Sequence, residues 1–162
     1  MYRSKGGEDM QIQIDTREKA RAIRKIVDEF DRQGVRYISS KMYVGDYCDL
    51  EHPLVIIDRK QNIAELAQNA TSGHDRFKRE LTRLDEMGAK MYILIEQDKI
   101  DGKKIESIED IMLWDSKFGS VQGPRIYRIL HAWQHTHNVE YVFCNKRNTG
   151  KEIIRLLGGA NE

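Results

Sequence analysis

The chain has 162 residues, and its 27 Lys and Arg against 26 Asp and Glu give a formal net charge of +1 at pH 7. This balance excludes a globally basic protein, so any attraction to nucleic acid has to be local. No apolar stretch approaches about 18 residues and no charged-then-apolar leader is present, which argues against a membrane span and a secretory signal. The two cysteines form no C-x-x-C pair, a pattern that fits a reducing cytoplasm.

Strand and helix patterns alternate along one domain at 10–158, between short tails at 1–9 and 159–162. We expect strands at 10–16, 36–40, 43–50, 54–58, 91–95 and 139–143. We expect helices at 19–33, 62–70, 75–87, 108–115, 124–136 and 150–157, and loops at 97–104 and 117–123. This alternation predicts a three-layer α/β domain with a central mixed β-sheet flanked by helices.

Asp58-Arg59-Lys60 follows directly after the apolar run Leu54-Val55-Ile56-Ile57. Such a run is typical of a strand buried on both faces. Residues two apart on a strand point to the same side of the sheet, so Asp58 and Lys60 are expected side by side. A carboxylate and an ammonium in that position can bind a metal ion and a phosphate together. The alternative is that these charged residues merely mark the end of a strand.

Four motifs in order carry a resemblance to a known family. Gly45-Asp46, followed by Asp58-Arg59-Lys60, resembles the Gly-Asp … Glu-Arg-Lys signature of the XPF-type structure-specific nuclease domain, a branch of the PD-(D/E)xK superfamily. The resemblance continues in Ile12-Gln13-Ile14-Asp15-Thr16-Arg17-Glu18 and in Asp75-Arg76-Phe77-Lys78-Arg79-Glu80-Leu81, and covers roughly 11–96. The chain is similar to the compact phage and prophage form of this domain, which lacks the helix-hairpin-helix module.

The resemblance implies a restriction-endonuclease-like fold and a Mg²⁺-dependent DNA endonuclease, with Mn²⁺ able to substitute for Mg²⁺. The expected substrate is branched or flapped duplex DNA in recombination, replication or repair. A homodimer through the nuclease domain is a further expectation, and no membrane partner is expected. The family implies a bacterial or phage-infected cytoplasm.

Four residues are the expected catalytic set. Asp46 and Asp58 would hold the metal, since carboxylate oxygens are hard ligands that suit Mg²⁺ and Mn²⁺. The carbonyl of Arg59 could add a ligand. Lys60 would orient or deprotonate the attacking water and offset phosphate charge. A lysine used as a base needs a lowered pKa. The family usually has Glu where this chain has Asp58, so the shorter side chain would bring the metal closer to the strand.

Other residues extend this set. Asp15 and Glu18 are expected to join the metal-binding carboxylates, although acidic residues at a strand end and a helix start also complement a helix dipole without any function. Arg17 is expected either to contact phosphate or to form a salt bridge within the cluster. Glu65 is expected to support the site indirectly or to cap a helix.

Arg76, Arg79 and Arg83 recur at i, i+3 and i+7 and form one basic stripe on the helix at 75–87. We expect this stripe to contact DNA phosphate, whereas the alternative is a solvated helix face. His131 and His135 stand at a spacing that can bind zinc, but no H-E-x-x-H pattern or nearby Cys pair completes such a site.

Two other functions remain open. One is a catalytically inactive pseudo-nuclease subunit that binds DNA, against which the intact Asp46, Asp58 and Lys60 argue. The other is a restriction-like degradative nuclease that shares only the wider fold.

Overall fold

A mixed six-stranded sheet lies at the centre of the protein in the computed structural model, which describes residues 10–116 and 121–159. The expected tail at 1–9, most of the tail at 159–162 and residues 117–120 of an expected loop lie outside the described residues. The strand order is β2-β1-β3-β4-β5-β8. The bounds are β1 Gln11–Ile14, β2 Arg36–Ser39, β3 Tyr47–Asp49, β4 His52–Lys60, β5 Lys90–Ile95 and β8 Val139–Phe143.

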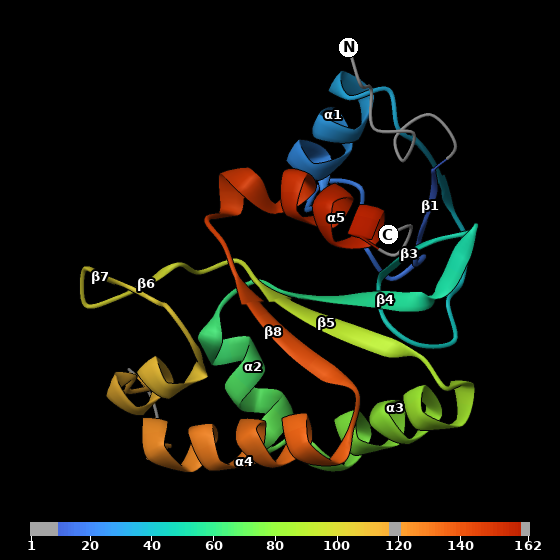
Figure 1. The fold of residues 1–162 in the computed structure, drawn as a ribbon. Coiled ribbons are helices and arrows are strands. Elements are labelled where there is room, and N and C mark those ends of the chain that lie inside the picture. Colours follow the sequence, from blue (N-terminus) through green and yellow to red (C-terminus); the bar gives the residue numbers. More distant parts are fainter. Residues whose placement is uncertain (1–9, 117–120, 160–162) are drawn as a thin grey trace.

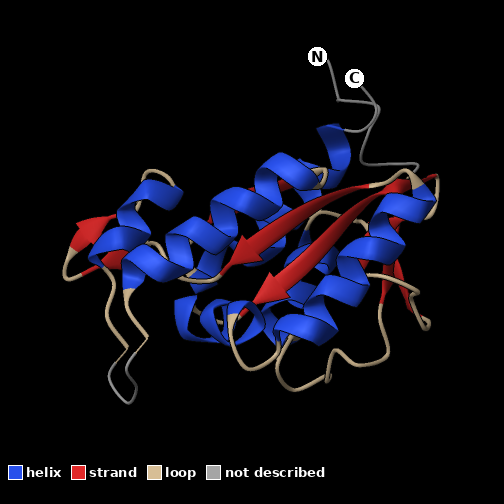
Figure 2. Ribbon diagram, turned by 90° about the horizontal axis from the view of Figure 1, so that it is seen from below, coloured by secondary structure: helices blue, strands red, loops and turns tan. Residues whose placement is uncertain are grey.

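Helices cover both faces of this sheet (Figure 1). α1 (Arg24–Arg32) and α5 (Thr149–Gly158) pack on one face, and α2 (Ile63–Ala70), α3 (His74–Met87) and α4 (Gly123–Thr136) pack on the other (Figures 1 and 2). Successive residues of β4 serve the two cores, because Ile56 packs in the α2–α3–α4 core and Ile57 in the α1–α5 core. The prediction of a three-layer α/β domain with a central mixed sheet is confirmed.

The directions of the strands determine where their ends meet. β4, β5 and β8 are parallel neighbours, so their carboxyl ends lie at one edge of the sheet. β3 runs antiparallel to both β1 and β4. Its amino end therefore lies beside the carboxyl ends of β1 and β4. The segments that follow β1 and β4 and the segment that precedes β3 thus meet at one place.

Several element boundaries differ from the sequence prediction. The helix expected at 19–33 begins only at Arg24, because the preceding residues form turns, as in the Ala22 N–H donating to the Lys19 carbonyl at 2.9 Å. The strand expected at 43–50 begins at Tyr47, because Gly45 has a φ of 75° and interrupts extended backbone.

The differences after β5 concern short elements. The loop expected at 97–104 contains a hairpin of β6 (Lys99–Ile100) and β7 (Lys103–Lys104), turned at Asp101 and Gly102, which have φ values of 50° and 79°. The helix expected at 108–115 is a 3₁₀ helix, η1, at Ile108–Leu113, and a second one, η2 (Lys146–Asn148), precedes α5. Within the described ranges, no helix has the length and apolar character needed to cross a bilayer.

Candidate active site

Asp58 and Lys60 lie side by side at the carboxyl end of β4. Lys60 Nζ is 2.8 Å from Asp58 Oδ2, and both residues are buried. Strand alternation predicts this arrangement, and β4 extends through Lys60, two residues beyond the expected end. The Phe77 ring of α3 lies beneath the ammonium, whose nitrogen is 5.0 Å from the ring centroid.

The environment of Lys60 favours its protonated form. Burial alone would lower the pKa of Lys60, but the charge of Asp58 outweighs it and holds that pKa above its ordinary value. Lys60 is therefore a cation in this structure. It is suited to offset phosphate charge and to orient water, and the sequence prediction of a base is not favoured by this geometry.

Asp46 reaches the same place from the segment that precedes β3. Its Oδ2 accepts a hydrogen bond of 2.8 Å from the Arg59 backbone N–H, and its own N–H donates to the Ile57 carbonyl at 2.8 Å. Gly45 permits this close approach to β4. A Cβ at that position would lie 2.2 Å from Ile56 Cγ2, and the φ of 75° disfavours other residues. Sterics therefore explain why a glycine precedes Asp46.

Negative charge is concentrated around Asp46 and Asp58. Burial, followed by the charges of Asp58 and Glu18, raises the pKa of Asp46 well above its ordinary value. Asp58 Oδ2 is a buried oxygen that accepts no hydrogen bond of good geometry from any described side chain or backbone group, although the Lys60 ammonium lies near it. A buried carboxylate with an unsatisfied oxygen is destabilising unless a cation offsets it.

Glu80 of α3 is a further acidic residue of this site, and the sequence interpretation did not single it out. Its Oε1 accepts a hydrogen bond of 2.8 Å from the Gly45 N–H. Burial and the charge of Asp58 raise the pKa of Glu80 above its ordinary value. The motif at 75–81 contained this residue, but the contact joins positions 35 apart in the chain, and no local pattern predicts it.

Arg59 points away from Lys60 and into a buried network of charges. Its Nη2 lies 2.6 Å from Glu18 Oε2, and its Nη1 lies 2.5 Å from Glu96 Oε1. Glu96 Oε2 in turn accepts a 2.6 Å hydrogen bond from the Thr149 hydroxyl at the start of α5. Burial disfavours the charged form, but Glu18 and then Glu96 raise the pKa of Arg59 above its ordinary value. The Arg59 side chain therefore links four segments that surround the site.

Asp15 and Arg17 lie behind Asp46. The Asp15 carboxylate accepts 2.8 Å from the Met42 N–H and 2.5 Å from Arg17 Nε. Burial opposes ionisation, yet the bonds from Met42 and Arg17 hold the pKa of Asp15 below its ordinary value. Both Asp15 oxygens are thus engaged, and this geometry favours an architectural role over the predicted metal role. Arg17 forms the salt bridge that the sequence left as one alternative.

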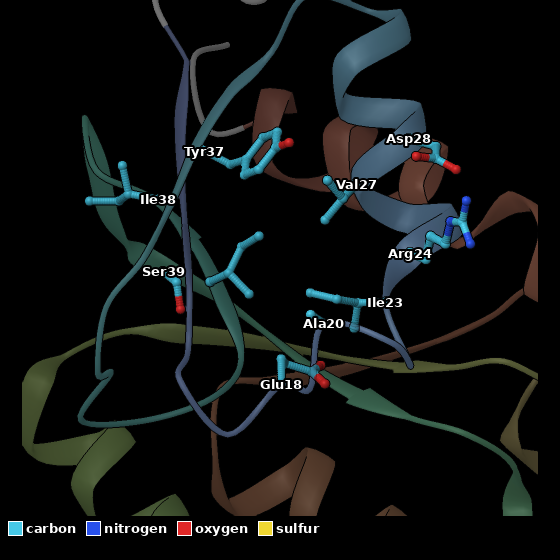
Figure 3. Close-up of a pocket in the computed structure, with 10 residues that line it drawn as sticks. Glu18, Ala20, Ile23, Arg24, Val27, Asp28, Tyr37, Ile38 and Ser39 are labelled. Carbon is cyan, nitrogen blue, oxygen red and sulfur yellow. The ribbon is translucent and has the colours of Figure 1, made fainter.

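A cavity of about 350 Å³ opens onto these residues. Six residues that the sequence singles out line it, namely Arg17, Glu18, Asp46, Arg59, Lys60 and Glu65. Glu18 also lines a second, mostly apolar cavity of about 380 Å³ between α1 and β2. Figure 3 shows Glu18 at one end of that second cavity, with Ile23, Val27 and Tyr37 along it. The candidate active site is therefore the first cavity, with Asp58 buried beside Lys60.

The fit of a divalent cation rests on Asp46 and Asp58. Within residues 10–116 and 121–159, no three His, Cys, Asp or Glu side chains form a group that could hold a metal ion. Glu18 is paired with Arg59, and Asp15 with Arg17. The repulsion between Asp46 and Asp58 is the feature that a bound cation would relieve. The two residues fit a divalent metal as a pair of hard oxygen donors.

The basic stripe on α3 borders the site through its last member. Arg76 and Arg79 are exposed on α3. Arg83 is half-buried, and its guanidinium carbon lies 5.6 Å from the centroid of the exposed Tyr43 ring. Glu80 lies on the same side of the helix as Arg76 and Arg83, because residues three and four apart are neighbours on a helix. The stripe therefore leads along α3 to the acidic site.

Glu65 and the pair of His131 and His135 are singled out in the sequence with other roles than catalysis. Glu65 caps α2, because its Oε2 accepts 2.8 Å from the Gln61 N–H while its own N–H donates to Asn62 Oδ1 at 2.8 Å. The capping role is confirmed. The Nε2 atoms of His131 and His135 lie 3.1 Å apart on the exposed side of α4, and the described part of the chain supplies no third ligand to them.

Residues 14–157 match the ERCC4 domain, and this protein belongs to that family. No curated protein matches the chain. The fold is similar to the solved structure of XPF from Aeropyrum pernix, with a TM-score of 0.68 and 18% sequence identity over 94% of this chain and 65% of that one. The XPF from Aeropyrum pernix in complex with DNA gives a TM-score of 0.66, also at 18% identity and over the same shares of the two chains.

These findings confirm the XPF-type nuclease domain and its central mixed sheet flanked by helices, a fold similar to that of XPF. Nucleases of the ERCC4 family are generally dependent on a divalent metal. The chain covers 65% of the length of each XPF chain it matches.

Proposed function

We propose that this protein is a Mg²⁺-dependent endonuclease that hydrolyses phosphodiester bonds in branched or flapped DNA. The observation that supports it most directly is the buried pair of Asp58 and Lys60, 2.8 Å apart at the end of β4, with Asp46 beside them. A metal ion held by a carboxylate and a neighbouring cation can both contact the same phosphate. The XPF structure in complex with DNA supports DNA as the partner.

Each residue of the site has a task in this proposal. Asp46 and Asp58 would hold the metal, which when bound lowers the pKa of water and offsets charge on the phosphate. Lys60, protonated and anchored by Asp58, would orient the attacking water and stabilise the phosphate oxygens. Arg59 would keep the end of β4 in position through Glu18 and Glu96. Arg17 lines the cavity with a side chain that is 66% exposed, so it can contact the phosphate backbone.

A cleavage panel tests this function. Flap, fork, four-way junction, single-stranded and plain duplex DNA would be incubated with Mg²⁺, with Mn²⁺ and with EDTA. We expect cleavage of flap or fork in Mg²⁺ and in Mn²⁺ and none in EDTA. Binding of branched DNA without cleavage in either metal would contradict the proposal and support the inactive DNA-binding subunit. Equal cutting of every duplex would support the degradative nuclease.

A further inference from the structure

Tyr43 is an exposed aromatic residue three positions before Asp46. Of its surface, 62% is exposed, whereas its neighbours Met42 and Val44 are 7% and 1% exposed. The segment therefore anchors itself with two buried side chains and presents the tyrosine ring to solvent. A ring with that exposure buries little apolar area, so folding stability gives little reason for an aromatic residue here.

The backbone around Tyr43 is held on both sides. The Met42 N–H donates to Asp15 Oδ1 at 2.8 Å, and the Gly45 N–H donates to Glu80 Oε1 at 2.8 Å. The first bond gives Asp15 a task, because it fixes the segment that carries Tyr43. Three peptide units separate Tyr43 from Asp46, so their Cα atoms lie within about 11 Å. The ring is thus presented by a fixed segment beside the candidate active site.

A permanent positive charge accompanies the ring. The Arg83 guanidinium carbon lies 5.6 Å from the Tyr43 ring centroid. Arg83 stands on α3 one turn after Glu80, so the same helix that contacts Gly45 also supports Tyr43. An aromatic face with an adjacent guanidinium is the combination that binds unpaired nucleotides, because bases stack on the ring and the cation attracts the backbone.

The Tyr43 ring and the Arg83 guanidinium together favour one class of ligand. In a duplex both faces of each base are already stacked, so the ring has nothing to bind without unstacking the helix. A nucleotide in a single strand has a free face. The carboxylates of Asp46, Asp58 and Glu80 would repel DNA. Lys60 and Arg17 are cations near them, and Arg83 follows Glu80 by one turn of α3.

We propose that Tyr43 and Arg83, here called the stacking platform, hold an unpaired nucleobase of the DNA substrate next to the scissile phosphate. The protein would thereby recognise the point where single-stranded DNA meets duplex. This inference rests on the proposed nuclease function and adds the two residues that would bind the unpaired strand. It assigns Arg83, apart from the rest of the basic stripe, to the unpaired strand.

The test uses flap DNA with 2-aminopurine placed in turn at each unpaired position near the junction. Binding is measured in EDTA by fluorescence and anisotropy, for the wild type, Tyr43→Ala and Tyr43→Phe. Leu113→Ala is the matched control, since Leu113 is 65% exposed, lies on η1 and is not among the residues that line the candidate active site. Thermal melts verify that every variant is folded.

We expect the wild type to change the fluorescence strongly at one or two positions. Tyr43→Ala should abolish that change and weaken flap binding by about tenfold, since stacking on an aromatic side chain contributes substantially per base. Plain duplex binding should stay within about twofold. Tyr43→Phe should retain the signal because it keeps the ring, and Leu113→Ala should behave as the wild type.

Two results would overturn the platform. One is an unchanged fluorescence signal in Tyr43→Ala, and the other is an equal loss of affinity for flap and duplex. Failure of the nuclease proposal has a separate signature, because it depends on cleavage with metal while this assay measures binding in EDTA. If the wild type cuts no DNA, the nuclease proposal is refuted. If its fluorescence signal is nevertheless absent in Tyr43→Ala, the platform is supported.

Discussion

Arg59 Nη1 lies 2.5 Å from Glu96 Oε1, and this contact ties the end of β4 to the residue that follows β5. The two strands are already joined there by the Glu96 N–H, which donates to the Lys60 carbonyl at 2.8 Å. The pair is buried, and Thr149 completes the hydrogen bonding of Glu96. The position of Lys60 therefore depends on residues that lie outside the catalytic motifs.

Replacing Glu96 by Gln should destabilise the protein, because it leaves the buried Arg59 charge only partly paired. We expect the free energy of unfolding, measured in urea, to fall by about 3 kcal/mol. Glu152→Gln is the matched control, because Glu152 pairs with Arg155 on the surface of α5, where ion pairs contribute less than about 1 kcal/mol. Equal losses of unfolding free energy in the two variants would mean that the buried Arg59 network contributes no more to stability than a surface ion pair.

Asp46→Asn, Asp58→Asn and Lys60→Ala should each lower the cleavage rate at least about a hundredfold while DNA affinity stays within a fewfold. Electrostatic contributions at the transition state are worth roughly 3 kcal/mol for each group removed. Single-turnover cleavage and anisotropy measure the two quantities separately. Asp85→Asn, on the exposed side of α3, is the control. Near-normal cleavage by any one of the three would remove that residue from the catalytic set.

The basic stripe is tested by the salt dependence of DNA binding. If Arg76, Arg79 and Arg83 bind phosphates, the triple alanine variant should bind DNA more weakly. The slope of log affinity against log salt should also flatten, by up to about 0.9 for each phosphate that is no longer neutralised. A control with Arg125→Ala and Arg128→Ala removes cations from α4 instead. An unchanged slope in the triple variant would show that the stripe is only solvated.

Local periodicity explains what the sequence could predict. Asp58 and Lys60 belong to one strand, so alternation is enough to place them together. The position of Asp46 depends on Gly45. The need for a glycine there becomes clear only in the folded protein, where Ile56 of β4 lies against it. Glu80 and Glu96 were not identified as members of the site, because their partners are 35 and 37 positions away. Tertiary pairing of this kind leaves no trace in hydrophobic spacing.

The misplaced boundaries have a related cause. The sequence near Glu18 has helical character, but Glu18 is bound by Arg59, and the helix starts five residues after the predicted position at Lys19. The sequence predicts Asp15 among the metal-binding carboxylates because Asp15 ends a strand in one of the family motifs. Its direction depends on the Met42 amide, which no pattern near Asp15 indicates.

Asp15→Asn should therefore destabilise the protein at neutral pH. The folded state holds the pKa of Asp15 below its ordinary value of 3.8, so its contribution is complete above that pH and is lost as the pH falls through the folded-state pKa. We expect a loss of about 2 kcal/mol at pH 7, typical of a charged hydrogen-bond acceptor. Urea unfolding at pH 7 and at low pH measures it. A stabilised variant would instead place Asp15 among repelling carboxylates.

Asp46→Asn should have the opposite effect in metal-free protein. Burial and the charges of Asp58 and Glu18 raise the pKa of Asp46 well above 3.8, so the folded state binds the extra proton. Stability conferred by that proton is present at low pH and is lost as the pH rises from 3.8 through the folded-state pKa. The asparagine variant carries no such charge, so in EDTA it should melt above the wild type at pH 7, and the difference should vanish near pH 4.

The same variant tests the metal site. Mg²⁺ at ten times its dissociation constant should stabilise the wild type by about 1.4 kcal/mol, which for a domain of this size is a melting shift of roughly 3 to 6 °C. Asp46→Asn should lose most of that shift, because it removes one of the two carboxylates proposed to hold the ion. Thermal melts of both proteins, in EDTA and in Mg²⁺, provide all four values. A variant that melts below the wild type in EDTA, or that keeps the full Mg²⁺ shift, would place Asp46 outside the metal site.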